Sequence, residues 1–387
     1  KGDNFMRVVV FLKRTFWTLF CPRTAAMVCL TAAAPALVGA GFQARAQTGP
    51  TLRSVDRAVE IALDPTYQYY ETEQGRGLTQ ASSRLTASVP VGQRFTVEAR
   101  AGYARTGGDR LSQVGGLTDA VGRLRYDRPL GEGSVVASAT VNAPVGKKQL
   151  SPDALRTMRF VSQNFYDFAV SSYSRGLSVS PRVTWAVPVT DRLAVGIGAG
   201  YQYQRGFEPR ANRGEYVPGN GAGVNAGIDY KLTRTSALGV DVAYRRYGPD
   251  RFEGARSFEA GARISGTLRY LFRAGFTTVR AVARYANWEE STFGYRAGGP
   301  DRGPIVPSHA LLLGSVQTRL SEAIDLRVRA SGHRYAETLR ARAKGVGRLF
   351  LSPAFEVAEG LTLAPHTAVS YGSYLGLGGG LRIEGEF

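Results

Sequence analysis

Cysteine is nearly absent from this chain of 387 residues, and both cysteines, Cys21 and Cys29, lie close to its beginning. We expect residues 1–46 to be removed as a leader, which would leave a mature chain without a thiol for a disulfide or a metal site. Histidine is also scarce, and none of the three histidines has a carboxylate at the spacing of a metal-ligand pair. No glycine-rich stretch has the strand-to-helix context of a phosphate-binding loop. The sequence therefore predicts neither a metal nor another cofactor.

Long apolar runs are also missing, since no stretch in the body of the chain reaches the length of a membrane-spanning helix. Acidic residues are outnumbered, with 31 Asp and Glu against 49 Lys and Arg. Removing residues 1–46 takes away six basic residues and one acidic residue, so the mature chain carries 43 − 30 = +13. The arginines are spread at strand spacing and form no patch, which argues against nucleic-acid binding. The spread favours a basic lumen, or basic loops that face anionic lipid.

The N-terminal region has the three parts of a secretory signal peptide. A basic stretch is followed by an apolar stretch at residues 25–40 and then by Ala44-Arg45-Ala46. This order predicts a signal peptide over residues 1–46 that is cleaved before Gln47. The alternative is a membrane anchor helix, but the apolar stretch is short and is interrupted by Pro35. Cleavage would place the rest of the chain outside the cytoplasm.

After a short lead at residues 47–57, which we expect to be periplasmic, residues 58–387 repeat one unit of about ten alternating residues and a turn. Successive strand side chains point to opposite faces, so alternation predicts strands with one apolar and one polar face. One such strand has Phe95, Val97, Ala99, Ala101 and Tyr103 on one parity, with Glu98 and Arg100 on the other. The strand near residue 312 is less regular, because Leu311 and Leu313 occupy its polar parity.

Short and long connections alternate along these strands, as they do in outer-membrane barrels with short periplasmic turns and longer outer loops. Seven tight turns join fourteen strands in hairpins, and a first and a last strand bring the predicted number to sixteen. Fourteen is the alternative, because Pro65 interrupts the first strand. Tyrosine and phenylalanine lie near the strand ends, as in the aromatic belts of a lipid-facing wall. The expected fold is an all-β, antiparallel, transmembrane up-and-down β-barrel over residues 58–387.

The last strand carries Leu381, Ile383 and the final residue Phe387 on its apolar parity. It resembles the C-terminal signature of bacterial outer-membrane β-barrels, although Gly385 stands where that signature usually has a large apolar residue. The resemblance implies location in the bacterial outer membrane, contact with its lipid, and recognition of these three residues by the barrel-assembly machinery. It is a resemblance to porin-like barrels in general.

The polar parity carries arginine on most strands, and we interpret these side chains as pore-lining. The candidates are Arg100, Arg123, Arg125, Arg182, Arg245, Arg263, Arg269, Arg284, Arg327, Arg329 and Arg348. Charges out of water must be paired or hydrated, so they either line a wet channel or form ion-pair ladders that close the lumen. We favour the channel, because a barrel of about sixteen strands leaves an aqueous lumen. The predicted function is passive conduction of small solutes with a preference for anions.

Two other functions remain open at this point. The chain could be a non-conducting barrel with a structural, adhesive or export-assisting role, whose outer loops bind a partner. It could also be an outer-membrane lipid hydrolase, since such enzymes place Ser and His on the lipid-facing wall. The serine and histidine pairs here, Ser331 with His333 and His366 with Ser370, fall on the lumen parity instead. We therefore expect no enzyme.

The longest loop, residues 144–175, is the third outer loop in the sixteen-strand count. The loop at that position in general porins folds inward and narrows the channel, so the resemblance suggests the same role here. Ser151 followed by Pro152 predicts the start of a short helix. The basic residues expected at the constriction are Lys147, Lys148, Arg156 and Arg159. The alternative is an external loop that packs over the mouth or on a neighbouring subunit.

The leader can be tested directly. We expect the mature protein to begin at Gln47 and to occur in outer-membrane fractions, because the Ala44-Arg45-Ala46 site precedes strands and not a stop-transfer helix. Mass spectrometry of the purified protein should give the mass of residues 47–387. Recovery of an intact leader, or fractionation with the inner membrane, would contradict this expectation.

Overall fold

The computed structural model describes residues 58–72, 75–147, 149–162, 166–210, 214–296, 299–339 and 341–387. The expected signal peptide and the lead that follows it lie outside these ranges. No helix in them combines the length and hydrophobicity needed to cross a bilayer.

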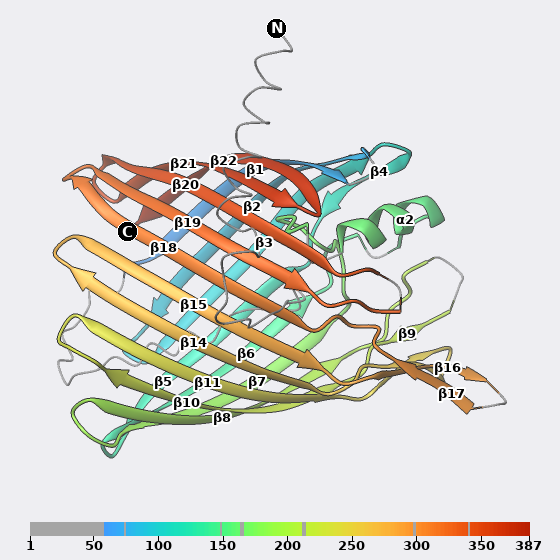
Figure 1. The fold of residues 1–387 in the computed structure, drawn as a ribbon, viewed down its shortest axis with the longest axis horizontal. Coiled ribbons are helices and arrows are strands. Elements are labelled where there is room, and N and C mark those ends of the chain that lie inside the picture. Colours follow the sequence, from blue (N-terminus) through green and yellow to red (C-terminus); the bar gives the residue numbers. More distant parts are fainter. Residues whose placement is uncertain are drawn as a thin grey trace, which may run out of the picture. The chain divides into compact units, whose positions relative to one another are not determined.

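Sixteen strands pair antiparallel, each with its neighbours along the chain, to form a closed barrel (Figure 1). They are β1 (Glu60–Thr72), β2 (Gly77–Val91), β3 (Phe95–Gly108), β5 (Ala120–Leu130), β6 (Gly133–Ala143), β7 (Ser178–Pro188), β8 (Leu193–Gln204), β10 (Gly221–Lys231), β11 (Ser236–Tyr247), β14 (Arg263–Ala274), β15 (Thr277–Trp288), β18 (His309–Ser321), β19 (Ile324–Tyr335), β20 (Lys344–Ala358), β21 (Leu361–Gly372) and β22 (Tyr374–Glu386). The predicted all-β, up-and-down barrel is confirmed.

A further strand, β4 (Leu111–Leu117), shares one barrel position with β5. Both strands pair with β3. β4 pairs with the loop-side end of β3, and β5 pairs with the other half of β3. They therefore act as one long strand that is broken at Thr118 and Asp119. The hairpin of β3 and β4 extends the barrel wall at this place.

The barrel closes where the first strand pairs with the last. β1 and β22 align from Glu60 opposite Glu386 to Thr72 opposite Tyr374. Pro65 leaves a gap in this ladder but still lies opposite Ser83 on β2. Proline removes one donor and does not end the strand, because Leu63 and Thr66 on either side of the gap keep their pairs on β22. The fourteen-strand alternative is therefore wrong.

The two ends of the barrel differ in their connections. The end on the left in Figure 1 has tight turns, and the other end has the long connections and the helix α2 (Pro152–Val161). Three of these connections form a second, five-stranded sheet. It consists of β17 (Gly299–Gly303), β16 (Ser291–Arg296), β13 (Ala255–Glu259), β12 (Pro249–Phe252) and β9 (Tyr216–Val217), in that order. The predicted segregation of short and long connections is confirmed.

The outer face of the barrel is apolar. Leu312, Ile197 and Val224 are 63%, 58% and 57% exposed, and each lies on the apolar parity of its strand. Large side chains so exposed would be unfavourable in water and suit contact with lipid. On β18, the same register turns Leu311 and Leu313 toward the inside, opposite Arg284 and Val282.

Removal of Phe387, or replacement of Leu381 and Ile383 by Asp, should lower the yield of folded barrel. The main chain of Phe387 makes two hydrogen bonds with Val59, at 2.8 and 2.9 Å, where the barrel closes. A basic residue on the outer face lowers the stability of the barrel by roughly 2–4 kcal/mol, and an acidic residue lowers it by less. Here two acidic residues are placed on the same strand. The heat-modifiable fraction after refolding into lipid vesicles measures this yield. Valine at Leu381 and Ile383 serves as the matched control, and a normal yield with both aspartates would contradict the prediction.

Candidate functional site

The candidate site is the inner wall of the barrel, where the register places all eleven arginines identified from the sequence. Each lies on the parity opposite to the exposed apolar residues; Arg263, for example, precedes Ile264, which is 48% exposed on the outer face. The eleven are Arg100, Arg123, Arg125, Arg182, Arg245, Arg263, Arg269, Arg284, Arg327, Arg329 and Arg348. They reach this wall from β3, β5, β7, β11, β14, β15, β19 and β20.

Some of the inward arginines are neutralised by carboxylates on the same wall. The pairs are Arg84 with Asp64 at 3.3 Å, Arg123 with Glu98 at 3.5 Å, Arg125 with Asp127 at 2.7 Å, Arg269 with Asp229 at 3.2 Å and Asp241 at 2.8 Å, and Arg382 with Glu384 at 2.8 Å. Most of these side chains are about a third exposed, so each pair contributes roughly 0.2–1 kcal/mol to stability. Their larger effect is to cancel charge along the wall.

Six of the eleven have no such partner: no carboxylate oxygen of the described residues lies within 4.0 Å of them. They are Arg100, Arg245, Arg263, Arg284, Arg327 and Arg329. Three guanidinium groups lie over aromatic rings instead: Arg245 over Tyr247 at 5.8 Å, Arg263 over Trp288 at 5.6 Å, and Arg329 over Phe350 at 5.6 Å. These contacts leave the positive charge uncancelled, so the wall is basic at these six positions.

Glycines on the inner face give two arginines room to lie against the wall. A Cβ at Gly200 would come within 2.8 Å of Cγ of Arg182, and a Cβ at Gly223 within 3.4 Å of Cβ of Arg245. Both glycines lie directly opposite these arginines on the neighbouring strand. A larger residue at position 200 would push Arg182 away from the wall, whereas the 3.4 Å contact at Gly223 is an ordinary van der Waals distance.

The predicted helix of the longest loop is confirmed as α2. The Ser151 hydroxyl caps it by accepting from the Ala154 N–H at 3.2 Å, and Pro152 is its first residue. The helix packs on β4, where the Thr157 hydroxyl donates to the Ser112 carbonyl at 2.7 Å. Its buried residues include Met158, which belongs to a hydrophobic cluster shared with the barrel strands.

Three of the four basic residues expected at the constriction are exposed on this loop. Arg156 and Arg159 are exposed on α2, and Arg156 is 3.9 Å from Asp153. Lys147 is exposed beside Gly116 of β4. Lys148 lies outside the described residues. The loop therefore turns these charges away from the helix packing surface.

A segment that the sequence did not single out, residues 166–176, makes the loop's contacts with the inner wall; we call it the inner-wall segment. Four of its side chains are buried: Tyr166, Phe168, Val170 and Tyr173. The first three alternate along the chain, as the apolar residues of a strand do. This alternation could have indicated a second buried part of the loop.

Two glutamines hold the main chain of the inner-wall segment. Gln80 on β2 donates to the Val170 carbonyl and accepts from the Val170 N–H, both at 2.8 Å. Gln68 on β1 accepts from the Ala169 N–H at 2.7 Å and donates to the Asp167 carbonyl at 3.0 Å. The side-chain amides thus replace the neighbouring strand that this main chain lacks.

An ion pair and a group of aromatic rings complete this attachment. Arg348 on β20 is 2.6 Å from the Asp167 carboxylate and donates to the Tyr374 hydroxyl at 2.7 Å. The Tyr374 ring lies 5.2 Å from that of Tyr70 and 5.1 Å from that of Tyr166. Arg348 is therefore a wall arginine whose charge is used to hold the loop.

Polar contacts also fix the end of the inner-wall segment. The Tyr173 hydroxyl donates to the Val114 carbonyl at 2.9 Å and lies 3.1 Å from the Thr106 hydroxyl. Burial raises the pKa of Tyr173, so the hydroxyl keeps the proton that it donates. Asp119, at the break between β4 and β5, accepts from the main-chain N–H of Arg175 at 2.7 Å and of Gly146 at 3.2 Å. Both ends of the loop are therefore bound to one carboxylate.

The three histidines all face inward. His309 and His333 stack on Tyr335, with ring centroids at 5.1 and 6.4 Å. His366 stacks on Phe350 at 5.6 Å and has its Nε2 3.9 Å from Asp64. Among the residues that the structure describes, no group of three or more His, Cys, Asp or Glu could hold a metal ion.

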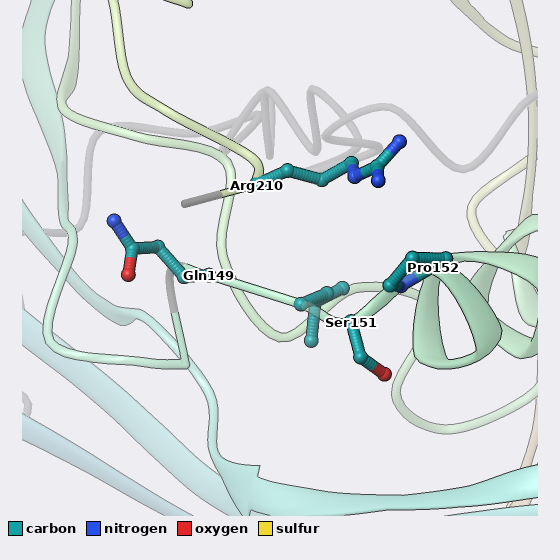
Figure 2. Close-up of a pocket in the computed structure, with 5 residues that line it drawn as sticks. Gln149, Ser151, Pro152 and Arg210 are labelled. Carbon is teal, nitrogen blue, oxygen red and sulfur yellow. The ribbon is translucent and has the colours of Figure 1, made fainter. Parts of the chain in front are cut away.

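A small pocket lies at the outer mouth, next to the start of α2. It is lined by Gln149, Leu150, Ser151, Pro152 and Arg210. In Figure 2, Arg210 extends from the β8–β10 connection across the pocket from Ser151. The Leu150 N–H donates to the Pro209 carbonyl at 3.0 Å, which joins the two connections there.

No family model and no curated protein matches this chain. Solved structures that resemble it include CdiB from Acinetobacter baumannii, at 11% identity and a TM-score of 0.46 over 84% of this chain and 60% of that one. A bacterial polysaccharide outer membrane secretin has 9% identity and a TM-score of 0.45 over 85% and 98%. An anion-selective porin from Comamonas acidovorans has 9% identity and a TM-score of 0.41 over 85% and 98%. Similarities at this level carry no argument about function.

The attachment of the inner-wall segment can be tested by replacing Gln68 and Gln80 with Ala. The variant loses four hydrogen bonds to the segment, each with a net value of about 0.5–1.5 kcal/mol. Amide exchange at Ala169 and Val170 should therefore rise by about tenfold or more, as measured by mass spectrometry on the folded barrel. The control is Gln317→Ala, which removes a glutamine from the inner face of β18. Unchanged exchange in the double variant would show that the glutamines do not hold the segment.

Proposed function

We propose that this chain is a bacterial outer-membrane channel that passively conducts small solutes and prefers anions. The apolar outer face and the polar inner face support insertion in a bilayer as a barrel with a hydrated interior. The proposal includes two partners: the lipid of the outer membrane, and an assembly machinery that recognises Leu381, Ile383 and Phe387.

The six inward arginines without a carboxylate partner are the observation that carries the anion preference. A row of fixed positive charges on the wall of a narrow aqueous passage lowers the energy of anions and raises that of cations. The ion pairs elsewhere on the wall offset little of this charge, because each one-to-one pair is neutral. Only Arg269, which meets both Asp229 and Asp241, leaves one negative charge in excess.

The longest loop supports the same proposal in two ways. Its inner-wall segment occupies part of the lumen near the outer end, which narrows the passage at that level. Lys147, Arg156 and Arg159 are exposed in the same loop, and with Lys148 they would add positive charge near the entrance. Anions would then meet basic groups at the mouth and along the wall.

A non-conducting barrel that binds a partner through its outer loops is the second candidate. The five-stranded sheet favours it, because three outer connections are ordered into one surface by strand pairing. Measurement of conductance in a planar bilayer separates the two proposals, since only the first predicts discrete channels.

The anion preference is tested by the double variant Arg245→Ser and Arg329→Ser. Neither arginine has a carboxylate partner among the described residues, so their removal subtracts two uncompensated charges. We expect the chloride-to-potassium permeability ratio, measured from the reversal potential in a salt gradient, to fall by about twofold or more.

The control is Arg192→Ser with Arg234→Ser, which removes two exposed arginines from the tight turns. It should leave the permeability ratio near its wild-type value. Equal ratios in all three proteins would rule out a role for the wall arginines in selectivity.

A further inference from the structure

One part of the inner wall, on β14, β15, β18 and β19, combines basic and apolar side chains in a way that the anion channel does not require. Leu311 lies directly between Arg284 on β15 and His333 on β19. Leu313 lies between Val282 and Ser331 in the same manner. Leucine on the inner face of a polar wall leaves apolar area facing the lumen. We call the surface formed by Val282, Arg284, Leu311, Leu313 and His333 the leucine patch.

Several polar atoms at the loop-side end of this patch lack a partner in the part of the chain that the structure describes. The indole Nε1 of Trp288, Nε of Arg263, both ring nitrogens of His309 and Nδ1 of His333 are buried without a hydrogen-bond partner there. Trp288 is 9% exposed and His309 is fully buried. An unsatisfied buried polar group costs about 1–3 kcal/mol, so a cluster of them on neighbouring strands calls for an explanation.

Basic side chains lie beside this cluster. Arg263 lies directly opposite Trp288, and Arg284 lies opposite Leu311, two residues along β18 from His309. Arg284 uses its Nε to donate to the Thr267 hydroxyl at 3.3 Å, and its guanidinium has no carboxylate partner in the described ranges. The cluster therefore offers indole and guanidinium N–H donors and positive charge, with the imidazole nitrogens of His309 beside them.

Aromatic rings give the cluster a rigid shape. Tyr247 stacks on Trp288 with centroids 5.4 Å apart and an interplanar angle of 21°. His309 stacks on Tyr335 at 5.1 Å and 10°. Stacked rings lose little conformational entropy when a ligand binds, so they suit a binding surface.

We propose that the leucine patch and its basic neighbours bind a small organic anion: a carboxylate with an apolar body. This inference rests on the proposed channel function, because the ligand would be a solute in the lumen. The carboxylate would pair with the guanidinium groups of Arg284 and Arg263, whose planar forks match its two oxygens. The hydrocarbon would lie on Leu311 and Leu313.

The same features argue against other ligand classes. A neutral sugar has no charge to pair with the guanidinium groups, so it would leave their positive charge uncompensated. An inorganic anion would gain nothing from the leucines. A carboxylate joined to a chain of several carbons uses both halves of the surface, so it should bind more tightly than either half alone.

Binding can be measured by calorimetry on the refolded wild-type protein in detergent, near neutral pH and at fixed ionic strength. The probes are hexanoate, acetate and 1-hexanol. We expect saturable binding of hexanoate and at least tenfold weaker binding of acetate, which lacks the chain, and of 1-hexanol, which lacks the charge. Acetate that binds as tightly as hexanoate would overturn the proposal in favour of a general anion site.

Three variants locate the site. Arg284→Gln removes the charge, and Leu311→Asn with Leu313→Asn removes the apolar area while keeping the inner face polar. Each should weaken hexanoate binding by about tenfold. The control Arg84→Gln makes the same charge change on β2, seven strand positions from β15 in the ring of sixteen.

Arg84→Gln should bind hexanoate as the wild type does. If it weakens binding as much as Arg284→Gln does, binding depends on the overall electrostatic field of the lumen and the site is not on the leucine patch. Heat-modifiability checks that each variant is folded, and if one fails to fold, the other decides the test. Wild-type channels that conduct without binding hexanoate would overturn this inference alone, whereas binding without conductance would overturn the proposed channel.

Discussion

The structure depends on the requirement that main-chain N–H and C=O groups be paired wherever water is absent. A sheet in lipid meets this requirement only when its last strand returns to its first, as β22 does to β1. Closure by antiparallel pairing makes the number of strands even, and it places the start of β1 and the end of β22 on the side of the tight turns. It also tolerates a local loss, since the ladder is interrupted at Pro65 and resumes at Thr66.

Once the sheet is closed, the alternation of side chains becomes a division between an outer and an inner face. The inner face receives almost all of the charge, and the structure accommodates it in two ways. Some arginines are neutralised by carboxylates on adjacent strands, as Arg269 is by Asp229 and Asp241. Others, such as Arg263, keep their charge and lie over an aromatic ring. The second group makes the wall basic and supports the proposed preference for anions.

Two parts of the inner wall have different surroundings. The inner-wall segment is held by residues of β1, β2 and β20, and it brings its own aromatic side chains to that side. The arginines without carboxylates lie mainly on β14, β15 and β19, where Leu311 and Leu313 also face inward. A solute in the lumen would thus meet the attached loop on one side and a basic, partly apolar surface on the other. The proposed binding of organic anions follows from this difference.

The sequence by itself determined the strands, their faces and the segregation of the loops, because these follow from a period of two residues and from local turns. The inward placement of Arg263 or Arg284 could be predicted for the same reason. The partners of these arginines could not be predicted from the sequence. Whether an arginine meets a carboxylate depends on the register between strands, and Gln80 meets Val170 across 90 residues of sequence. Only closure of the barrel and inward packing of the loop bring such residues together, and no local pattern records either event.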